Sequence, residues 1–249
     1  MIILKSPREI ERMRAACRIV REVLNLIQEE VRPGLTTLAL DRLAEKQAKK
    51  MGARPAFKGY SGYPYSLCCS INEQVVHGMP AERELLEGDV LSLDYGVVYD
   101  GYFGDAAVTL PVGRVTREAE KLIRVTSESL ELGIEQAVPG NRLSDISHAV
   151  QVHAESNGFS VVREFVGHGI GTSLHESPQV PNFGLPGKGV KLKPGMVLAI
   201  EPMINQFAPG VRILGDGWTA VTLDGGLSAH FEHTVAITDN GPDILTRLI

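Results

Sequence analysis

Residues 90–110, VLSLDYGVVYDGYFGDAAVTL, restrict the possible fold more than any other stretch, because they predict a β-hairpin that carries two acids on one face. An Asp-Gly pair at positions 100–101, between two apolar-rich arms, is a strong signal for a two-residue hairpin loop. With that loop, Gly96 opposes Asp105, and the alternation of side chains places Asp94 on the same face as a diagonal neighbour. Two carboxylates this close repel each other. The hairpin therefore requires a partner, which is a proton, a lysine or arginine, or a metal ion.

The same arrangement occurs a second time later in the chain. Segment 86–94 (LEGDVLSLD) matches segment 192–201 (LKPGMVLAIE) once one extra residue is allowed, so that Asp94 corresponds to Glu201. The strand that begins at Asp105 likewise matches the strand that begins at Glu232. Turn and stop signals recur at equal separations: Pro-Gly at 33–34 and 139–140, and Gly at 52 and 158. Internal self-similarity of this kind predicts two copies of one structural unit, and each copy carries one acid per hairpin arm.

Each copy is predicted to contain two helices followed by strands. Apolar residues at helical spacing predict helices over about 7–31, 37–51, 116–138 and 143–157, the first opened by a capping box at Ser6. A strand pair is predicted around Asn72-Glu73. We therefore expect an α+β fold with half-repeats at about 6–113 and 116–249, forming one catalytic domain over residues 1–249. If the two halves pair their sheets about a pseudo-two-fold axis, the four acids converge in a central pocket.

Composition excludes several other classes of protein. Across 249 residues the net charge is −5, which argues against broad binding to nucleic acid, and 43% apolar with 22% charged residues is ordinary for a globular chain. The N-terminal stretch MIILKSPREIERMRAAC is too charged for a signal peptide, and no apolar run approaches the length of a membrane span. Three cysteines, two of them adjacent, do not form a disulfide framework. A cytoplasmic protein with buried thiols is the expectation.

Four carboxylates in one pocket (Asp94, Asp105, Glu201 and Glu232) would repel one another strongly. Divalent cations are the natural compensation, and this many carboxylates calls for two ions, because a carboxylate can bridge a pair of ions about 3.5–4 Å apart. Oxygen-rich ligation with an imidazole suits Mn, Fe(II), Co or Zn. A structural zinc site would instead need a cluster of thiolates. The sequence therefore predicts a dinuclear metal centre.

Three of the seven histidines are candidates for this centre. His168 and His175 lie in GHGIGTSLHE, where flanking glycines allow the backbone to turn tightly and bring a ring close to a partner, and His77 ends a strand in VVHGMP. The remaining four are predicted to face solvent on a helix or to be structural: His148, His153, His230 and His233.

Five motifs together resemble the methionine aminopeptidases of the short bacterial type, within the pita-bread (creatinase/aminopeptidase-like) metallopeptidase family. They occur in order over nearly the whole chain: HG at 77–78, Asp94 with Asp105, GHGIG…H at 167–175, AIEP at 199–202 and FEHT at 231–234. The resemblance implies the two-half pita-bread fold. It also implies removal of the initiator methionine from nascent proteins whose second residue is small, by attack of a metal-bridging hydroxide on the scissile carbonyl.

The resemblance further implies a role for each site residue. Asp94 would bind one metal ion through both oxygens, Asp105 and Glu232 would bridge the two ions, and His168 and Glu201 would complete the second. Glu201 would also move protons, His175 would hydrogen-bond the carbonyl oxygen, and His77 would assist the leaving amine. The pocket for the methionine side chain would be lined by Phe57, Tyr60, Tyr63, Cys68, Leu174 and Trp218. A monovalent cation, Na or K, would lie beneath the site near Asn72 and Ser228.

The chain departs from the family pattern at two wall positions, where Phe57 replaces a frequent Cys and Leu174 a frequent Phe, which moves bulk from one wall of the pocket to the other. Two alternatives stay open: an X-Pro dipeptidase or aminopeptidase of the same fold, and a non-catalytic binding protein of this fold. The expected partners are nascent N-termini at the ribosome. We expect a monomer that binds neither membranes nor specific nucleic-acid sequences.

Overall fold

The hairpin predicted at residues 90–110 is present in the structure, a computed structural model that describes residues 2–247. Strands β4 (Val90–Tyr99) and β5 (Tyr102–Pro111) pair with Tyr99 opposite Tyr102, as predicted. Asp100 and Gly101 both have positive φ (49° and 78°), which is the backbone of the hairpin turn that favours Asp-Gly. Arg12 donates to the Asp100 carboxylate at 2.6 Å and so ties this turn to the first helix.

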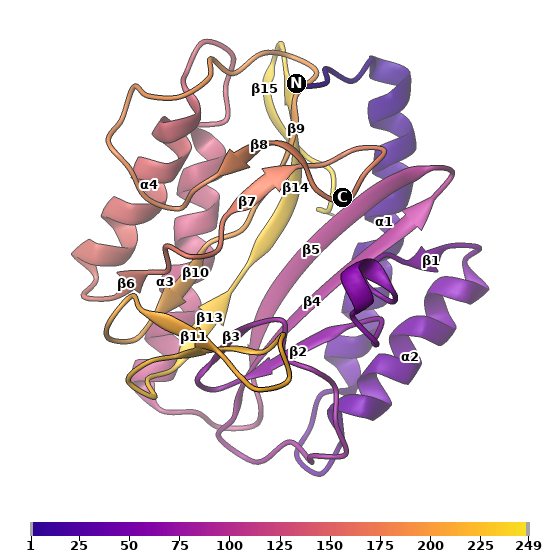
Figure 1. The fold of residues 1–249 in the computed structure, drawn as a ribbon, viewed down its shortest axis with the longest axis vertical. Coiled ribbons are helices and arrows are strands. Elements are labelled where there is room, and N and C mark those ends of the chain that lie inside the picture. Colours follow the sequence, from indigo (N-terminus) through magenta and orange to yellow (C-terminus); the bar gives the residue numbers. More distant parts are fainter. Residues whose placement is uncertain (1, 248–249) are drawn as a thin grey trace.

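Two helix pairs flank the main sheet (Figure 1). The first pair is α1 (Pro7–Glu30) with α2 (Thr37–Lys50), and the second is α3 (Arg117–Glu135) with α4 (Leu143–Ser156). The predicted capping box at Ser6 forms, because Glu9 N donates to Ser6 Oγ at 3.4 Å and Ser6 N donates to Glu9 Oε2 at 2.7 Å. The third helix ends three residues earlier than predicted, since Ala137 and Val138 continue in a turn.

The main sheet brings the two halves of the chain together (Figure 1). Its central strands are β5 from the first half and β14 (Glu232–Thr238) from the second, paired antiparallel with Glu232 opposite Ala107. The strand order is β1-β4-β5-β14-β9-β7-β8, with β2 added on β4 and β15 on β14. The remaining bounds are β1 (Arg54–Pro55), β2 (Cys68–Ile71), β7 (Gly167–Gly169), β8 (Glu176–Val180), β9 (Val197–Ile200) and β15 (Gly241–Ile244).

Two three-stranded sheets lie beside the main sheet, and most of their strands come from the second half. Their orders are β13-β10-β6 and β11-β12-β3. The strand pair predicted around Asn72-Glu73 is therefore wrong in one respect, because β2 pairs with β4 whereas β3 pairs with β12. The side chain of Asn72 explains the separation: it accepts from Val90 N at 2.9 Å and so joins this turn to the start of β4. The bounds are β3 (Gln74–Val76), β6 (Ser160–Val161), β10 (Met203–Asn205), β11 (Val211–Ile213), β12 (Ala220–Thr222), β13 (Ser228–His230) and the 3-10 turn η1 (Tyr60–Gly62).

Each helix pair packs on its own half of the main sheet. Val20 and Val23 of α1 join Leu91, Leu93 and Tyr95 of β4 in one buried cluster. A second buried cluster, in which α3 and α4 pack on β9 and β14 of the second half, is likewise apolar: Leu130, Ile134, Ile146, Leu198, Ile200 and Val235. All three cysteines are buried and free, as predicted. None of the helices within residues 2–247 is long and apolar enough to cross a membrane.

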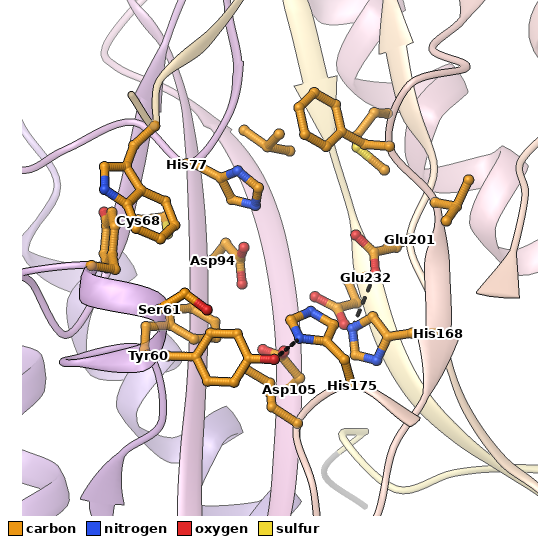
Figure 2. A pocket seen from close by; sticks show the side chains of 18 residues that line it. Tyr60, Ser61, Cys68, His77, Asp94, Asp105, His168, His175, Glu201 and Glu232 are labelled. Carbon is orange, nitrogen blue, oxygen red and sulfur yellow. Dashed lines mark hydrogen bonds and ion pairs between the residues drawn. The ribbon is translucent and has the colours of Figure 1, made fainter. Parts of the chain in front are cut away.

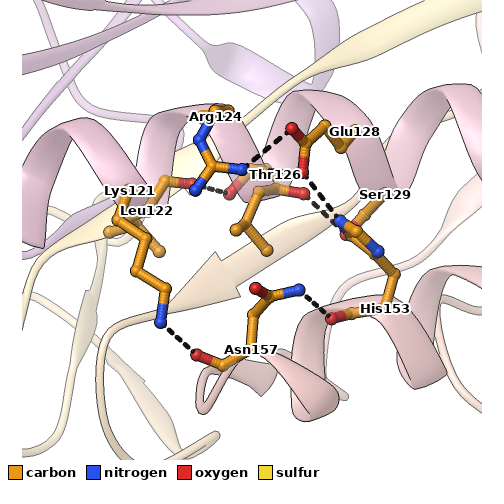
Figure 3. Close-up of polar contacts among 9 residues, drawn as sticks. Lys121, Leu122, Arg124, Thr126, Glu128, Ser129, His153 and Asn157 are labelled. Atoms are coloured by element: carbon orange, nitrogen blue, oxygen red, sulfur yellow. Dashed lines mark hydrogen bonds and ion pairs between the residues drawn. The ribbon is translucent and has the colours of Figure 1, made fainter.

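Polar contacts join α3 to α4 on the outer face (Figure 3). Glu128 accepts from Arg124 at 2.9 Å and from His153 Nε2 at 2.9 Å. His153, predicted to be solvated, is therefore half-buried against the neighbouring helix, whereas His148 bonds the backbone of Gly184. Glu128, the carboxylate partner of His153, lies 25 residues away in sequence, so only the packing of α3 against α4 brings the two side chains together.

Candidate metal centre

A cavity of about 220 Å³ opens between the two halves and collects the predicted site residues. Figure 2 shows the contributions of the first half facing those of the second across it. All of the candidates named for metal binding, catalysis and the methionine pocket line it: Phe57, Tyr60, Tyr63, Cys68, His77, Asp94, Asp105, His168, Leu174, His175, Glu201, Trp218 and Glu232. Asn72 and Ser228, named for a monovalent cation, do not belong to this lining. Five further residues complete the lining: Ser61, Val76, Phe165, Val166 and Met203.

The hairpin delivers its two acids to the cavity because glycines allow close approach on both of its sides. Gly96 lies opposite Asp105, as predicted, and a Cβ there would meet Phe57 at 2.9 Å and Asp105 Oδ1 at 3.1 Å. Gly104 lets β5 rest directly on α1, since a Cβ would come within 2.8 Å of the Cys17 backbone nitrogen. The glycine opposite Asp105 therefore leaves space for the carboxylate and for an aromatic wall beside it.

Three side chains from three strands form a compact ligand set. Asp105 of β5, His168 of β7 and Glu232 of β14 are buried, and each offers one ligand atom within 4.8 Å of the others. Glu201 directly follows β9, and its Oε1 lies 3.4 Å from His168 Nε2. Asp94 faces the same cavity from β4. The four acids thus converge although they lie on four different strands or strand ends.

The His168 ring is oriented for ligation through Nε2. Its Nδ1 lies 2.9 Å from the carbonyl oxygen of Gly169, a contact in which Nδ1–H donates and Nε2 keeps its lone pair. Burial lowers the pKa of His168 to about 4, with a further contribution from nearby His175. The imidazole is therefore neutral at physiological pH, which is the form that binds a metal ion.

Burial shifts the pKa values of all four acids upward. It raises the pKa of Asp94 to about 7 and that of Glu201 to about 8. The pKa of Asp105 rises well above its usual range through burial and the charges of Asp94 and Glu201, and the pKa of Glu232 rises through burial and Asp105. Clustered acids with pKa values displaced this far are typical of functional sites.

The described part of the chain supplies no cationic side chain to balance these acids. Their only ion-pair contacts within residues 2–247 are those of Glu201 with His168 and His230. One oxygen each of Asp94, Asp105 and Glu232 is buried without a hydrogen-bond partner among the same residues. Buried polar atoms normally have partners, and an orphaned carboxylate oxygen is a potential metal ligand. The residues present therefore fit divalent metal ions, with oxygen donors and one imidazole.

A pH dependence follows for the stability of the metal-free protein. Between about pH 7 and pH 8 the folded state still holds protons on buried carboxyls, whereas the unfolded state has released them, so stability falls as pH rises through the folded pKa values of about 7 for Asp94 and about 8 for Glu201. Each such proton changes the free energy of unfolding by ~1.4 kcal/mol per pH unit. Bound metal holds the carboxylates ionised and should remove this slope. Urea unfolding of chelated and metal-loaded protein at both pH values measures it.

The comparison of metal-free with metal-loaded protein separates the effect of the four carboxylates on stability from the effects of other titrating groups. The buried thiols also destabilise the fold as pH rises, because burial raises the pKa of Cys17 to about 12, but they do so in both forms. The neutral histidines act at lower pH, since their folded pKa values lie near 4 for His77 and His168. Parallel slopes with and without metal would contradict the assignment of the four acids as metal ligands.

His175 stands at the mouth of the cavity and is held from two sides. The hydroxyl of Tyr60 contacts its Nδ1 at 2.7 Å (Figure 2). The next residue, Glu176, forms a buried ion pair with Lys5 at 2.5 Å. Glu176 also accepts from Ser173 N at 3.2 Å, which closes the loop in front of His175. Tyr60 was expected only to line the side-chain pocket, and its contact with His175 joins the two halves of the chain.

His77 and an aromatic wall occupy the opposite side of the cavity. Trp218 packs edge-on against Tyr63 at 5.1 Å between ring centroids, and His77 packs edge-on against Phe165 at 5.4 Å. Phe165 was missed in the sequence, although it lies just before the glycine-rich segment that contains His168. Its signal was weak, because a single aromatic residue in a loop is usually explained by packing.

His230 was predicted to be structural, and the structure places it closer to the chemistry. Its Nε2 lies 3.6 Å from Glu201 Oε2, and the ring is fully buried. Its strand parity, which matches that of Glu232, was the available signal. The contact arises because β13 pairs with β10, which follows Glu201 after a short link. His230 therefore lies behind Glu201 and outside the described cavity lining.

Known proteins show the same chain organisation. Residues 11–239 match metallopeptidase family M24. A methionine aminopeptidase of Clostridium perfringens (strain 13 / Type A) is 59% identical over 248 residues, which cover 100% of both chains. A crystal structure of a methionine aminopeptidase from Thermotoga maritima has a TM-score of 0.98 at 49% identity and also covers 100% of both chains. The structure of a prolidase from Pyrococcus horikoshii OT3 has a TM-score of 0.80 at 25% identity, and the match spans 100% of this chain but 65% of the prolidase.

Proposed function

The chain belongs to metallopeptidase family M24, and from this premise we propose that its central cavity is the active site of an enzyme that removes N-terminal methionine from polypeptides. The fold is the pita-bread fold, and the enzyme is a metal-dependent aminopeptidase. The observation that carries this conclusion is the convergence of Asp105, His168 and Glu232 in a cavity that also has an aromatic wall. Similarity to the methionine aminopeptidases extends over whole chains, which disfavours the X-Pro alternative.

We assign the metal ligands as follows. Asp94 would hold one divalent ion through both oxygens, Asp105 and Glu232 would bridge two ions, and His168 and Glu201 would complete the second. One oxygen of each of Asp94, Asp105 and Glu232 lacks a hydrogen-bond partner among residues 2–247, which supports this arrangement. Bound divalent ions supply Lewis-acid activation of the scissile carbonyl and of the attacking water. Co, Mn, Fe(II) and Zn all suit this donor set.

The remaining polar side chains would guide protons and charge. Glu201 would accept a proton from the attacking water at its carboxylate and pass it to the leaving amine; His168 and His230 hold that carboxylate from two sides. His175 would donate from Nε2 to the carbonyl oxygen as negative charge develops there. His77, which burial keeps neutral by lowering its pKa to about 4, would contact the nitrogen of the scissile bond.

The aromatic wall supports recognition of the methionine side chain. Tyr63, Cys68 and Trp218 line the cavity with Phe57 and Leu174, and this apolar slot suits an unbranched thioether. We propose that the second residue of the substrate must be small. Cleavage of a Met-X-Ser series with X from Gly to Leu tests this, and equal rates for Gly and Leu would contradict it.

Several finer assignments are also part of the proposal. Residues 1–249 would form one catalytic domain of two half-repeats that acts as a cytoplasmic monomer on nascent chains at the ribosome; sedimentation of the purified protein, alone and with ribosomes, tests this.

A monovalent cation, Na or K, would bind near Asn72 and Ser228. The backbone joins these two residues, since Ser228 N donates to Asn72 O at 2.9 Å. Thermal midpoints that are identical in Na, K and a bulky organic cation would contradict this site.

A direct assay separates the three functional readings. After exhaustive chelation, the protein is supplied with each of Co, Mn, Fe(II) and Zn and given Met-Ala-Ser and Ala-Pro peptides. Release of methionine that depends on added metal is expected. Preferential cleavage of Ala-Pro would favour an X-Pro peptidase, whereas no cleavage of either peptide, with metal bound, would favour a binding protein. Full activity after chelation would contradict metal dependence.

Tyr60→Phe is expected to lower kcat by roughly 2–10-fold, the effect of one lost hydrogen bond, with little change in KM. The hydroxyl contacts His175 Nδ1 at 2.7 Å and, as donor, fixes the tautomer that has its proton on Nε2. Steady-state kinetics on Met-Ala-Ser measure the effect. Tyr65→Phe, in the same segment but outside the described cavity lining, is the matched control. An equal change in both variants would remove Tyr60 from the orientation of His175.

A further inference from the structure

The seam between the two halves of the main sheet is unusual in how its backbone is paired. β5 and β14 share only a short ladder, in which Glu232 lies opposite Ala107 and His233 opposite Ala106. Beyond each end of this ladder, a threonine hydroxyl takes the place of a direct peptide-to-peptide bond. In the main sheet, β5 and β14 are the strands of the two halves that pair with each other; one hydroxyl belongs to Thr234 on β14, and the other to Thr109 on β5, whose partner His230 ends β13 just before β14.

Each hydroxyl satisfies both backbone groups of the residue opposite. Thr234 Oγ1 accepts from Asp105 N at 3.2 Å and donates to Asp105 O at 2.8 Å. Thr109 Oγ1 accepts from His230 N at 2.8 Å and donates to His230 O at 2.7 Å. Both threonines are buried. One side-chain oxygen is thus inserted between the strands at each end, which fixes their separation there.

The backbone N–H and C=O of Thr234 are hydrogen-bonded to residues outside β5, so its hydroxyl makes the hydrogen bonds to β5. Thr234 pairs with Ala199 of β9, its N–H donates to Thr246 Oγ1 at 3.3 Å, and its carbonyl accepts from Leu245 N at 2.9 Å. Loss of the hydroxyl would leave the N–H and C=O of Asp105 buried without these partners, and such groups are costly to leave unpaired.

We propose that Thr234 is a positioning residue for the metal centre, whose hydroxyl sets the separation of the Asp105 and Glu232 carboxylates. This rests on the proposed function, in which both acids bridge the two ions. The hydroxyl holds the backbone of Asp105 from a position two residues beyond Glu232, so one side chain links the two strands that carry the bridging acids. The compact set of Asp105, His168 and Glu232 depends on this spacing.

The test compares metal binding in variants of Thr234. Thr234→Val keeps the shape of the side chain and removes the hydroxyl, and it is expected to weaken divalent-metal binding roughly 10–100-fold, the range for groups that orient ligands. Thr234→Ser keeps the hydroxyl and should bind within about threefold of the parent, far less than the loss expected without it. The affinity of Mn or Co for the chelated protein is measured by titration calorimetry, independently of turnover, and kcat is measured separately.

Thr126→Val is the matched control for loss of a buried threonine hydroxyl. Thr126 is fully buried on α3, where its hydroxyl donates to Leu122 O at 2.8 Å (Figure 3). This variant should lose stability without losing metal affinity. If Thr234 acted in folding alone, Thr234→Val and Thr126→Val would have the same metal affinity once they are compared under conditions of equal stability. That result would overturn the proposal.

A further variant covers the case in which Thr234→Val does not fold. Thr234→Ala leaves room for a water molecule in place of the hydroxyl and is expected to bind metal more weakly than Thr234→Ser. Equal affinities of the Ala and Ser variants would overturn the proposal. The two proposals can fail separately, because metal affinity is measured independently of turnover. If the parent protein binds metal but cleaves no peptide, the proposed function is contradicted. The role of Thr234 in spacing the two acids would still be supported if its variants lose metal affinity as expected.

Discussion

Asp105→Asn is expected to lower kcat on Met-Ala-Ser by roughly 10³-fold or more, because an amide offers one oxygen where the proposed bridge between two ions needs a carboxylate. The fold should survive this change. Asp105 is buried, and burial together with neighbouring acids raises the pKa of its carboxyl well above the usual range, so removal of the ionisable group relieves repulsion in the metal-free protein. Metal stoichiometry, kcat and the urea midpoint of the chelated variant are the measurements.

Asp100→Asn is the control for this prediction. Asp100 lies in the turn of the same hairpin, where its carboxylate accepts from Arg12 on the surface. Its replacement leaves the cavity untouched, so activity close to that of the parent is expected. Near-parent activity of Asp105→Asn, with metal bound, would instead exclude the two-metal interpretation.

His175→Ala is expected to lower kcat by roughly 10²-fold or more while metal content stays that of the parent. The reason is that a donor to the developing oxyanion contributes mainly in the transition state. His175 reaches the mouth of the cavity and contacts Tyr60, but it does not belong to the compact ligand set formed by Asp105, His168 and Glu232. Metal analysis beside steady-state kinetics separates loss of a donor from loss of an ion.

His153→Ala provides the matched control for His175. Its ring is half-buried between α3 and α4 and pairs with Glu128 (Figure 3), and it does not belong to the cavity lining. A small loss of stability with unchanged kcat is expected for it. An unchanged kcat in His175→Ala would remove that histidine from the proposed mechanism.

Most of the local structure of this chain could be predicted from its sequence. The Asp-Gly turn determined the register of the 90–110 hairpin, and period-two alternation then placed Asp94 and Asp105 on one face. Helix limits followed from the capping box at Ser6 and from glycine stops, with one error at the end of α3. These features depend on residues close together in sequence, so no knowledge of the tertiary fold was needed.

Contacts between distant residues were harder to predict. The turn at Asn72 was identified, but the partner strands of β2 and β3 were not, because several strands could satisfy the same apolar pattern. His230 was assigned a structural role although its strand parity matches that of Glu232, and only its 3.6 Å approach to Glu201 revealed its position. The contact of Tyr60 with His175 crosses between the two halves and had no local signal.

The sequence by itself determined which side chains this protein brings to chemistry: two acid-bearing hairpins, with His77, His168 and His175 at glycine-rich strand ends. Turn geometry and side-chain alternation are local properties, and they suffice to place those groups on one face of each half. Only the tertiary structure decided how far apart the groups lie. That separation depends on the β5–β14 seam, where the halves meet over a short ladder and the hydroxyls of Thr109 and Thr234 complete the pairing. The spacing of two strands that are far apart in sequence is set by the packing of the whole chain, and no local pattern encodes it.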